Sequence, residues 1–137
     1  MAWTVGAIAV GVGLAAVGVG LATVYLAVAR RGSAQAERRW HGLALVVVAL
    51  IYVGFALLGN PDWLDLELLG VALVGALAWA GVTRDPLWLA AGWAAHMLPH
   101  GGRSAVFMPA GYAALCVGSD LVVAVYVLAL RRRIAAG

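Results

Sequence analysis

Residues 40–59 read WHGLALVVVALIYVGFALLG and contain no Asp, Glu, Lys or Arg. An α-helix rises 1.5 Å per residue, so it needs about 20 apolar residues to cross a hydrocarbon core that is roughly 30 Å thick. The stretch therefore predicts a transmembrane helix.

Four further apolar stretches flank this one, and the five together predict an all-α polytopic helix bundle that forms a single transmembrane domain over residues 1–137. The expected spans are Trp3 to Ala29, Trp40 to Gly59, Leu66 to Val82, Pro86 to Pro99 and Met108 to Leu130. The fourth is short for a full crossing. It is expected either as a half-helix that leads into irregular backbone at residues 99–102 or as a re-entrant segment, and protein must shield such backbone from lipid.

The composition agrees with a membrane protein. Hydrophobic residues make up 65% of the chain and charged residues 11%, against roughly 45–50% and about 25% in an ordinary soluble domain. The single cysteine, Cys116, excludes an intramolecular disulfide framework. Arginines lie at the ends of apolar runs, so we expect the lipid bilayer as partner and no nucleic acid.

The arginines also predict the orientation, because short loops rich in Arg stay in the cytoplasm. With five crossings, Arg103 is the one arginine that falls outside. We therefore expect an external N-terminus, a cytoplasmic C-terminus and a multi-pass protein of the cell membrane, which in a bacterium is the inner membrane. The first basic residue is Arg30, so the first apolar run lacks the charged leader of a signal peptide and is expected to be retained.

The first span carries small residues at steps of three and four, here called the small-residue seam. They are Ala2, Gly6, Ala9, Gly13, Ala16, Gly20, Thr23 and Ala27. A second stripe consists of Gly11, Ala15, Gly18 and Ala22. Small residues let helices approach closely in lipid. The sequence leaves open whether the seam packs within the chain or joins copies into a homo-oligomer.

Several polar side chains are expected at similar depth in the membrane, where ionisable groups usually face a bundle interior or a cavity. Counting from the arginine-marked ends places His96 and Asp120 roughly 15 Å deep. The other members of this polar slab, about 18–22 Å deep by the same count, are Tyr52, Glu67, His100 and Cys116. If the faces of the fourth and fifth spans meet, His96 opposes Asp120.

The slab suggests a specific chemistry. Two histidines at i, i+4 together with carboxylates match the ligands of a zinc or iron site, so His96 and His100 are the candidate metal ligands. Glu67 or Asp120 would act as general base. The residues expected to contact a substrate are Tyr52, Trp93, Tyr112 and Cys116.

Three functions remain open at this stage. The first is an intramembrane site for a divalent metal or a small amphiphilic substrate, with hydrolysis as the reaction considered. The second is a proton-coupled transporter or channel subunit in which Asp120 and His96 exchange a proton. The third is a structural membrane subunit, in which the His96–Asp120 pair only satisfies itself and Cys116 packs as a small apolar residue. His41, beside Trp40, is expected at the membrane interface.

Three segments resemble a family of small uncharacterised bacterial integral membrane proteins. They are Leu66–Gly70 with Glu67, Ala91–His96 with its Trp-x-x-His element, and Pro109–Tyr112 leading into Cys116 and Asp120. Where that family has Trp-Asp after the histidine, this chain has Leu98-Pro99. The resemblance covers about the second half of the chain and implies that Glu67, His96, Cys116 and Asp120 act as a set.

Overall fold

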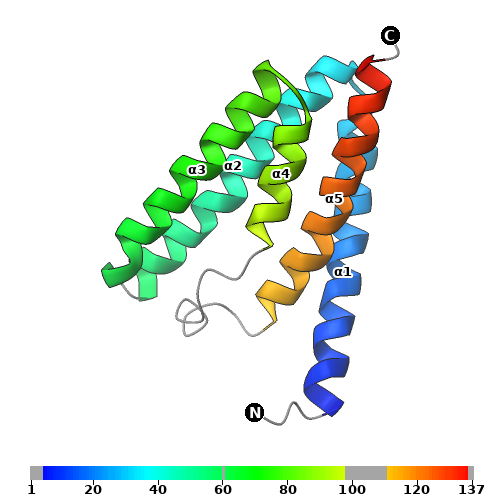
Figure 1. Ribbon diagram of the computed structural model, residues 1–137. Helices are drawn as coiled ribbons and strands as arrows, with labels where there is room; N and C mark the ends of the chain where they lie inside the picture. Colours follow the sequence, from blue (N-terminus) through cyan, green and yellow to red (C-terminus); the bar gives the residue numbers. More distant parts are fainter. Residues whose placement is uncertain (1–4, 60, 98–110, 136–137) are drawn as a thin grey trace.

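The computed structural model describes residues 5–59, 61–97 and 111–135, which form five α-helices and one short 3-10 helix (Figure 1). The elements are α1 Val5–Ala29, α2 Ala34–Gly59, η1 Pro61–Trp63, α3 Leu64–Thr83, α4 Leu87–His96 and α5 Tyr112–Ala135. Four stretches, α1, α2, η1 with α3, and α5, are long and apolar enough to cross a membrane. The predicted all-α helix bundle is confirmed.

The fourth helix is the short one. α4 has 10 residues and a length of about 15 Å, which is half of a hydrocarbon core. This length suits both forms that the sequence leaves open, the half-helix and the re-entrant segment. The irregular backbone expected at residues 99–102 lies outside the described residues.

α2 begins earlier than the sequence pattern predicts. Its first residue is Ala34 rather than Trp40, because Ser33 caps the helix by accepting a hydrogen bond from the Ala36 N–H at 3.2 Å. The added turns carry charged side chains into the bundle. Both Glu37 and Arg38 are buried.

The helices pack as two long pairs around α4. α2 lies along α3, α1 lies along α5, and α4 contacts both α3 and α5 (Figure 1). α1, α3 and α5 finish at the end of the bundle where α2 and α4 begin. This end is called the arginine-rich end.

Polar contacts hold the arginine-rich end together. Asp85, in the turn between α3 and α4, forms a two-pronged ion pair with Arg131 of α5, with N–O distances of 2.7 and 2.9 Å. The guanidinium holds the pKa of the Asp85 carboxyl below its usual value. Asp85 also accepts the Leu87 N–H at 2.8 Å at the start of α4. Arg38 of α2 donates to the carbonyl of Gly81 in α3 at 2.6 Å.

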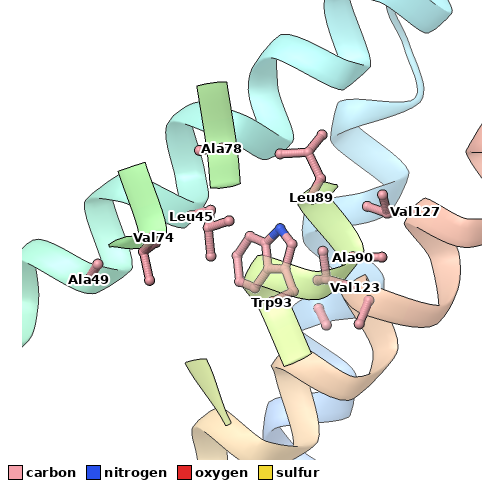
Figure 2. Packing of buried hydrophobic residues seen from close by; sticks show 11 residues of the cluster. Leu45, Ala49, Val74, Ala78, Leu89, Ala90, Trp93, Val123 and Val127 are labelled. Carbon is pink, nitrogen blue, oxygen red and sulfur yellow. The ribbon is translucent and has the colours of Figure 1, made fainter. Parts of the chain in front are cut away.

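Trp93 of α4 lies in the middle of the apolar core (Figure 2). Its indole is 4% exposed and lies between Leu45 on one side and Ala90 with Val123 on the other. The full cluster consists of Ala22, Leu45, Ala49, Val74, Ala78, Leu89, Ala90, Trp93, Val123, Ala124 and Val127. A short helix thus occupies the position where the two long pairs meet.

α1 and α5 touch backbone to backbone. A Cβ on Gly18 would overlap the carbonyl oxygen of Leu115, and a Cβ on Gly118 would overlap that of Ala15. Ala22, one turn after Gly18, is 3% exposed. From Ala15 to Ala22 the second stripe of small residues therefore packs within the chain, as close helix contacts in membranes require, whereas a Cβ on Gly11 would meet nothing within 4 Å.

The small-residue seam has a different environment. All of its described members, from Gly6 to Ala27, are exposed, and a Cβ at Gly6, Gly13 or Gly20 would meet nothing within 4 Å. The seam thus makes no packing contact with the rest of the described chain. Self-association stays a prediction for this face.

Replacing Gly18 by Ala should destabilise the bundle, because the new methyl group meets backbone that cannot move aside without separating α1 from α5. The expected loss is about 1–3 kcal/mol, measured as thermal or denaturant unfolding in detergent. Gly13→Ala is the matched control on the exposed face and should be neutral or slightly stabilising, since alanine favours helix. Equal effects of the two substitutions would contradict the α1–α5 contact.

Candidate functional site

The centre of the site is a hydrogen bond between two buried ionisable side chains. His96 Nδ1 lies 2.6 Å from Asp120 Oδ2, and the two residues are 3% and 1% exposed. His96 is the last residue of α4, and Asp120 lies just after the first two turns of α5. The contact that residue counting predicts is therefore present.

The helical repeat brings both residues to the interior. On α4, Leu89, Trp93 and His96 recur at steps of four and three and are all buried. On α5 the buried positions are Cys116, Asp120, Val123 and Val127. The turn before α5 ends at Gly111, whose φ of 86° lies in the left-handed region that favours glycine.

Aromatic rings pack next to the His96–Asp120 pair. The ring of Tyr52 on α2 meets the His96 imidazole edge to face, with centroids 5.1 Å apart. Tyr52 also contacts Tyr112 at 6.2 Å, and Phe55 contacts Tyr112 at 5.4 Å. The hydroxyls of Tyr52 and Tyr112 lie near the Cys116 side chain. The thiol thus has polar groups as well as apolar side chains around it.

Ser119 is a member of the site that the sequence analysis does not single out. Its hydroxyl lies 3.0 Å from the Cys116 carbonyl oxygen and 3.3 Å from Asp120 Oδ1. It can donate to one of these at a time, so the serine is able to exchange its hydrogen bond between backbone and carboxylate. The only signal in the sequence is its position next to Asp120 in an otherwise apolar helix.

A cavity of about 220 Å³ reaches the pair from between α1, α2, α4 and α5. Its polar lining is concentrated at His96, Asp120, Ser119, Tyr112 and Cys116. The remaining lining residues are Leu21, Ala22, Tyr25, Ala44, Val48, Trp93, Leu115 and Val123. The cavity is therefore mainly apolar, and most of its polar lining lies around the His96–Asp120 pair.

The other predicted site residues divide into three cases. Trp93 lines the cavity and also forms part of the core, and its indole N–H has no acceptor among the described residues. Glu67 is buried on α3 at 4% exposure, but no described contact joins it to His96 or Asp120, and it does not line the cavity. His100 lies outside the described residues.

This arrangement bears on the metal hypothesis. Within residues 5–59, 61–97 and 111–135, no three His, Cys, Asp or Glu side chains converge as a metal site would require. Asp120 and His96 supply a carboxylate and an imidazole, and a zinc or iron ion normally takes three or four such protein ligands. A divalent-metal cofactor at this site would thus depend on His100, and it stays a prediction.

The chemistry that the described atoms support is proton exchange. A carboxylate that bonds one ring nitrogen of histidine fixes the ring orientation and stabilises the imidazolium that forms when the ring takes a proton. The His96–Asp120 pair can therefore hold a proton and give it back. When the pair gains or loses a proton, the Ser119 hydroxyl can switch its hydrogen bond between the Cys116 carbonyl and the Asp120 carboxylate.

A double-mutant cycle should show that His96 and Asp120 are energetically coupled. Each of His96→Leu and Asp120→Leu leaves the other group buried without its partner, at a cost of roughly 3–5 kcal/mol. The double variant should recover part of this loss, measured as unfolding stability in detergent. The control cycle pairs His96→Leu with Glu37→Leu, a buried carboxylate on α2, and should be additive. Additive losses for His96 and Asp120 would contradict the contact.

Comparisons of the chain with protein-family models, with characterised proteins and with solved structures found no match. The resemblance of the second half to a family of small bacterial membrane proteins is therefore not tested by them. The function of this chain has to be argued from the geometry of the His96–Asp120 pair and the cavity beside it.

Proposed function

We propose that this protein binds a small amphiphilic molecule in the cavity between α1, α2, α4 and α5 and exchanges a proton with it through His96 and Asp120. The observation that carries the proposal is the hydrogen bond of 2.6 Å between His96 Nδ1 and Asp120 Oδ2 on the lining of that cavity. The proposal extends to location: the chain acts in the cell membrane, with the arginine-rich end in the cytoplasm.

The burial of the pair supports a role in proton exchange. An ionised carboxylate is costly in an apolar medium, and a proton shared with an imidazole lowers that cost. Such groups inside membrane spans commonly mark proton or ligand sites. A pair that bonds at 2.6 Å with a hydroxyl nearby is suited to take up one proton without gaining an isolated charge.

The cavity supports an amphiphilic rather than a strongly polar ligand. Leu21, Val48 and Val123 line its apolar part, where transfer of a hydrocarbon group from water is favourable. Polar groups occur together on one side, where Ser119 and Tyr112 flank the pair. A ligand with an apolar body and a single polar, ionisable group satisfies both parts.

The probe para-nitrophenol tests binding and proton transfer together, because it is small, mostly apolar, has one ionisable hydroxyl, and absorbs at longer wavelength as the anion. Wild-type protein in lipid nanodiscs should bind it saturably and raise its anionic fraction above that in empty nanodiscs. Asp120→Asn keeps the shape of the side chain but removes its charge, so it should bind the probe and lose most of the anion signal.

A cavity-filling variant provides the control for the site of binding. Ala44 lines the cavity, so Ala44→Leu should abolish saturable binding, whereas Ala76→Leu adds the same atoms on the exposed face of α3 and should bind as wild type does. Binding that is unchanged in Ala44→Leu, or an anion signal that persists in Asp120→Asn, would refute the proposal.

A further inference from the structure

A second buried polar cluster lies at the arginine-rich end of the bundle. Glu37 and His41 are one turn apart on α2, and both are 0% exposed. They continue the buried stripe of α2 that runs through Leu45, Ala49 and Tyr52. The structure thus buries the His41 side chain between helices, while its expected depth at the membrane interface stays a prediction.

Other helices complete this cluster. The Tyr25 hydroxyl of α1 lies 2.9 Å from His41 Nδ1. From α5, the Tyr126 hydroxyl donates to Glu37 Oε1, and Arg133 Nη1 lies 3.4 Å from Glu37 Oε2. The rings of Tyr25 and Tyr126 lie 5.5 and 5.8 Å from the His41 ring. Three helices therefore converge on one carboxylate and one imidazole.

One atom of the cluster is incompletely satisfied. His41 Nε2 is buried and has no hydrogen-bond partner among the described residues. It faces Glu37 Oε1 at 3.9 Å, which is too far for a hydrogen bond. A buried polar atom left in this state costs free energy. Burial disfavours a positively charged His41 ring, and the nearby Glu37 carboxylate offsets part of that effect.

Tyr25 connects this cluster to the site described above. Its hydroxyl bonds His41, and the same residue lines the cavity that reaches His96 and Asp120. Ala44, one turn after His41, lines the cavity as well. Tyr25 thus links His41 to the cavity that reaches the other buried histidine–carboxylate pair.

We propose that Glu37, His41 and Tyr25 form a second proton-binding site, which passes protons between the cavity and water at the arginine-rich end. The inference rests on the proposed function in so far as the His96–Asp120 pair exchanges the protons that reach the cavity. The ligand of the second site is a proton, and its donor is water or an ionisable molecule bound in the cavity.

The hydrogen bonds allow the transfer in balanced steps. Neutral His41 accepts the Tyr25 O–H at Nδ1 and carries its own proton on Nε2. A proton from the cavity binds the Tyr25 oxygen as the tyrosine proton passes to Nδ1, so tyrosine is restored and His41 becomes charged. The Nε2 proton then moves to Glu37 as the two side chains close the 3.9 Å gap between them, and Glu37 passes it to water. His41 keeps its remaining proton on Nδ1, so the next transfer requires the ring to regain the Nε2–H form and the Tyr25 hydroxyl to turn back. One proton enters and one leaves.

Charged groups surround the cluster at the arginine-rich end. Arg133 contacts Glu37, and the Arg30 guanidinium lies over the Tyr126 ring, 5.7 Å from its centroid. Arg38, next to Glu37 in sequence, bonds the Gly81 carbonyl. Glu37 is therefore the member of the cluster that lies next to the exposed arginines of this end, and the proposal has protons leave through it.

The test measures how fast the cavity equilibrates with external pH. Nanodisc protein with bound para-nitrophenol is mixed rapidly with buffer of lower pH, and the loss of the anion band is followed. Tyr25→Phe removes the relay hydroxyl and should slow this change roughly a hundredfold, while the final absorbance stays as in wild type. Thr23→Val removes an exposed hydroxyl of the same helix, which bonds the Val19 carbonyl outside the cluster, and should leave the rate close to wild type.

The outcomes separate this inference from the proposed function. If the probe binds and ionises normally but Tyr25→Phe reacts as fast as wild type, or Thr23→Val is slowed equally, the relay is overturned and the proposed function stands. If the probe does not bind in any variant, the proposed function fails, and the second site is judged by nitrogen NMR of His41.

In that NMR experiment on ¹⁵N-histidine-labelled protein, His41 should take a proton as the pH falls. Glu37→Gln should move the midpoint to lower pH, because it removes the charge that stabilises the imidazolium. Tyr25→Phe should change the Nδ1 signal, since the hydrogen bond at that atom is lost. A His41 signal that is insensitive to both substitutions would overturn the second site; the expected changes would support it without the probe.

Discussion

A carboxylate inside an apolar helix bundle needs a partner, and Asp120 has one in His96. The bond of 2.6 Å between them requires α4 and α5 to lie side by side at a fixed register. It also requires α4 to end at the depth where His96 meets Asp120. Packing of Trp93 against α2 and α5 holds the short helix in that place. The site and the core therefore depend on the same helix.

The long helices create the space in which this pair lies. α1 and α5 touch backbone to backbone at Gly18 and Gly118, whereas α1 makes few contacts with α2. The cavity of about 220 Å³ lies between α1, α2, α4 and α5. An apolar chamber with a polar side is a feature of small-molecule sites, and here the polar side is the buried pair.

Much of this could be predicted from the sequence. Apolar runs of about 20 residues report membrane helices directly, and a constant rise per residue places His96 and Asp120 level with each other. The same count puts Glu67 at the depth of the polar slab, yet no described contact joins Glu67 to the His96–Asp120 pair. The count fails here because depth says nothing about the direction in which a side chain points around its helix.

The cluster at the arginine-rich end was beyond a prediction from hydropathy. Glu37 stands next to two arginines, so a hydropathy argument assigns it to a loop and begins the helix at Trp40. The Ser33 cap and the partners on α1 and α5 extend the helix instead. The available signal was the spacing of Glu37 and His41 on the stripe that continues through Leu45 and Tyr52.

The measurement that tests the central claim most directly is proton and nitrogen NMR of the His96 side chain in lipid nanodiscs. A short bond to a buried carboxylate predicts a strongly deshielded Nδ1 proton that disappears in Asp120→Asn, while the signals of His41 stay unchanged. A His96 Nδ1 proton with the shift of a free imidazole, or one that is indifferent to Asp120→Asn, would contradict the account.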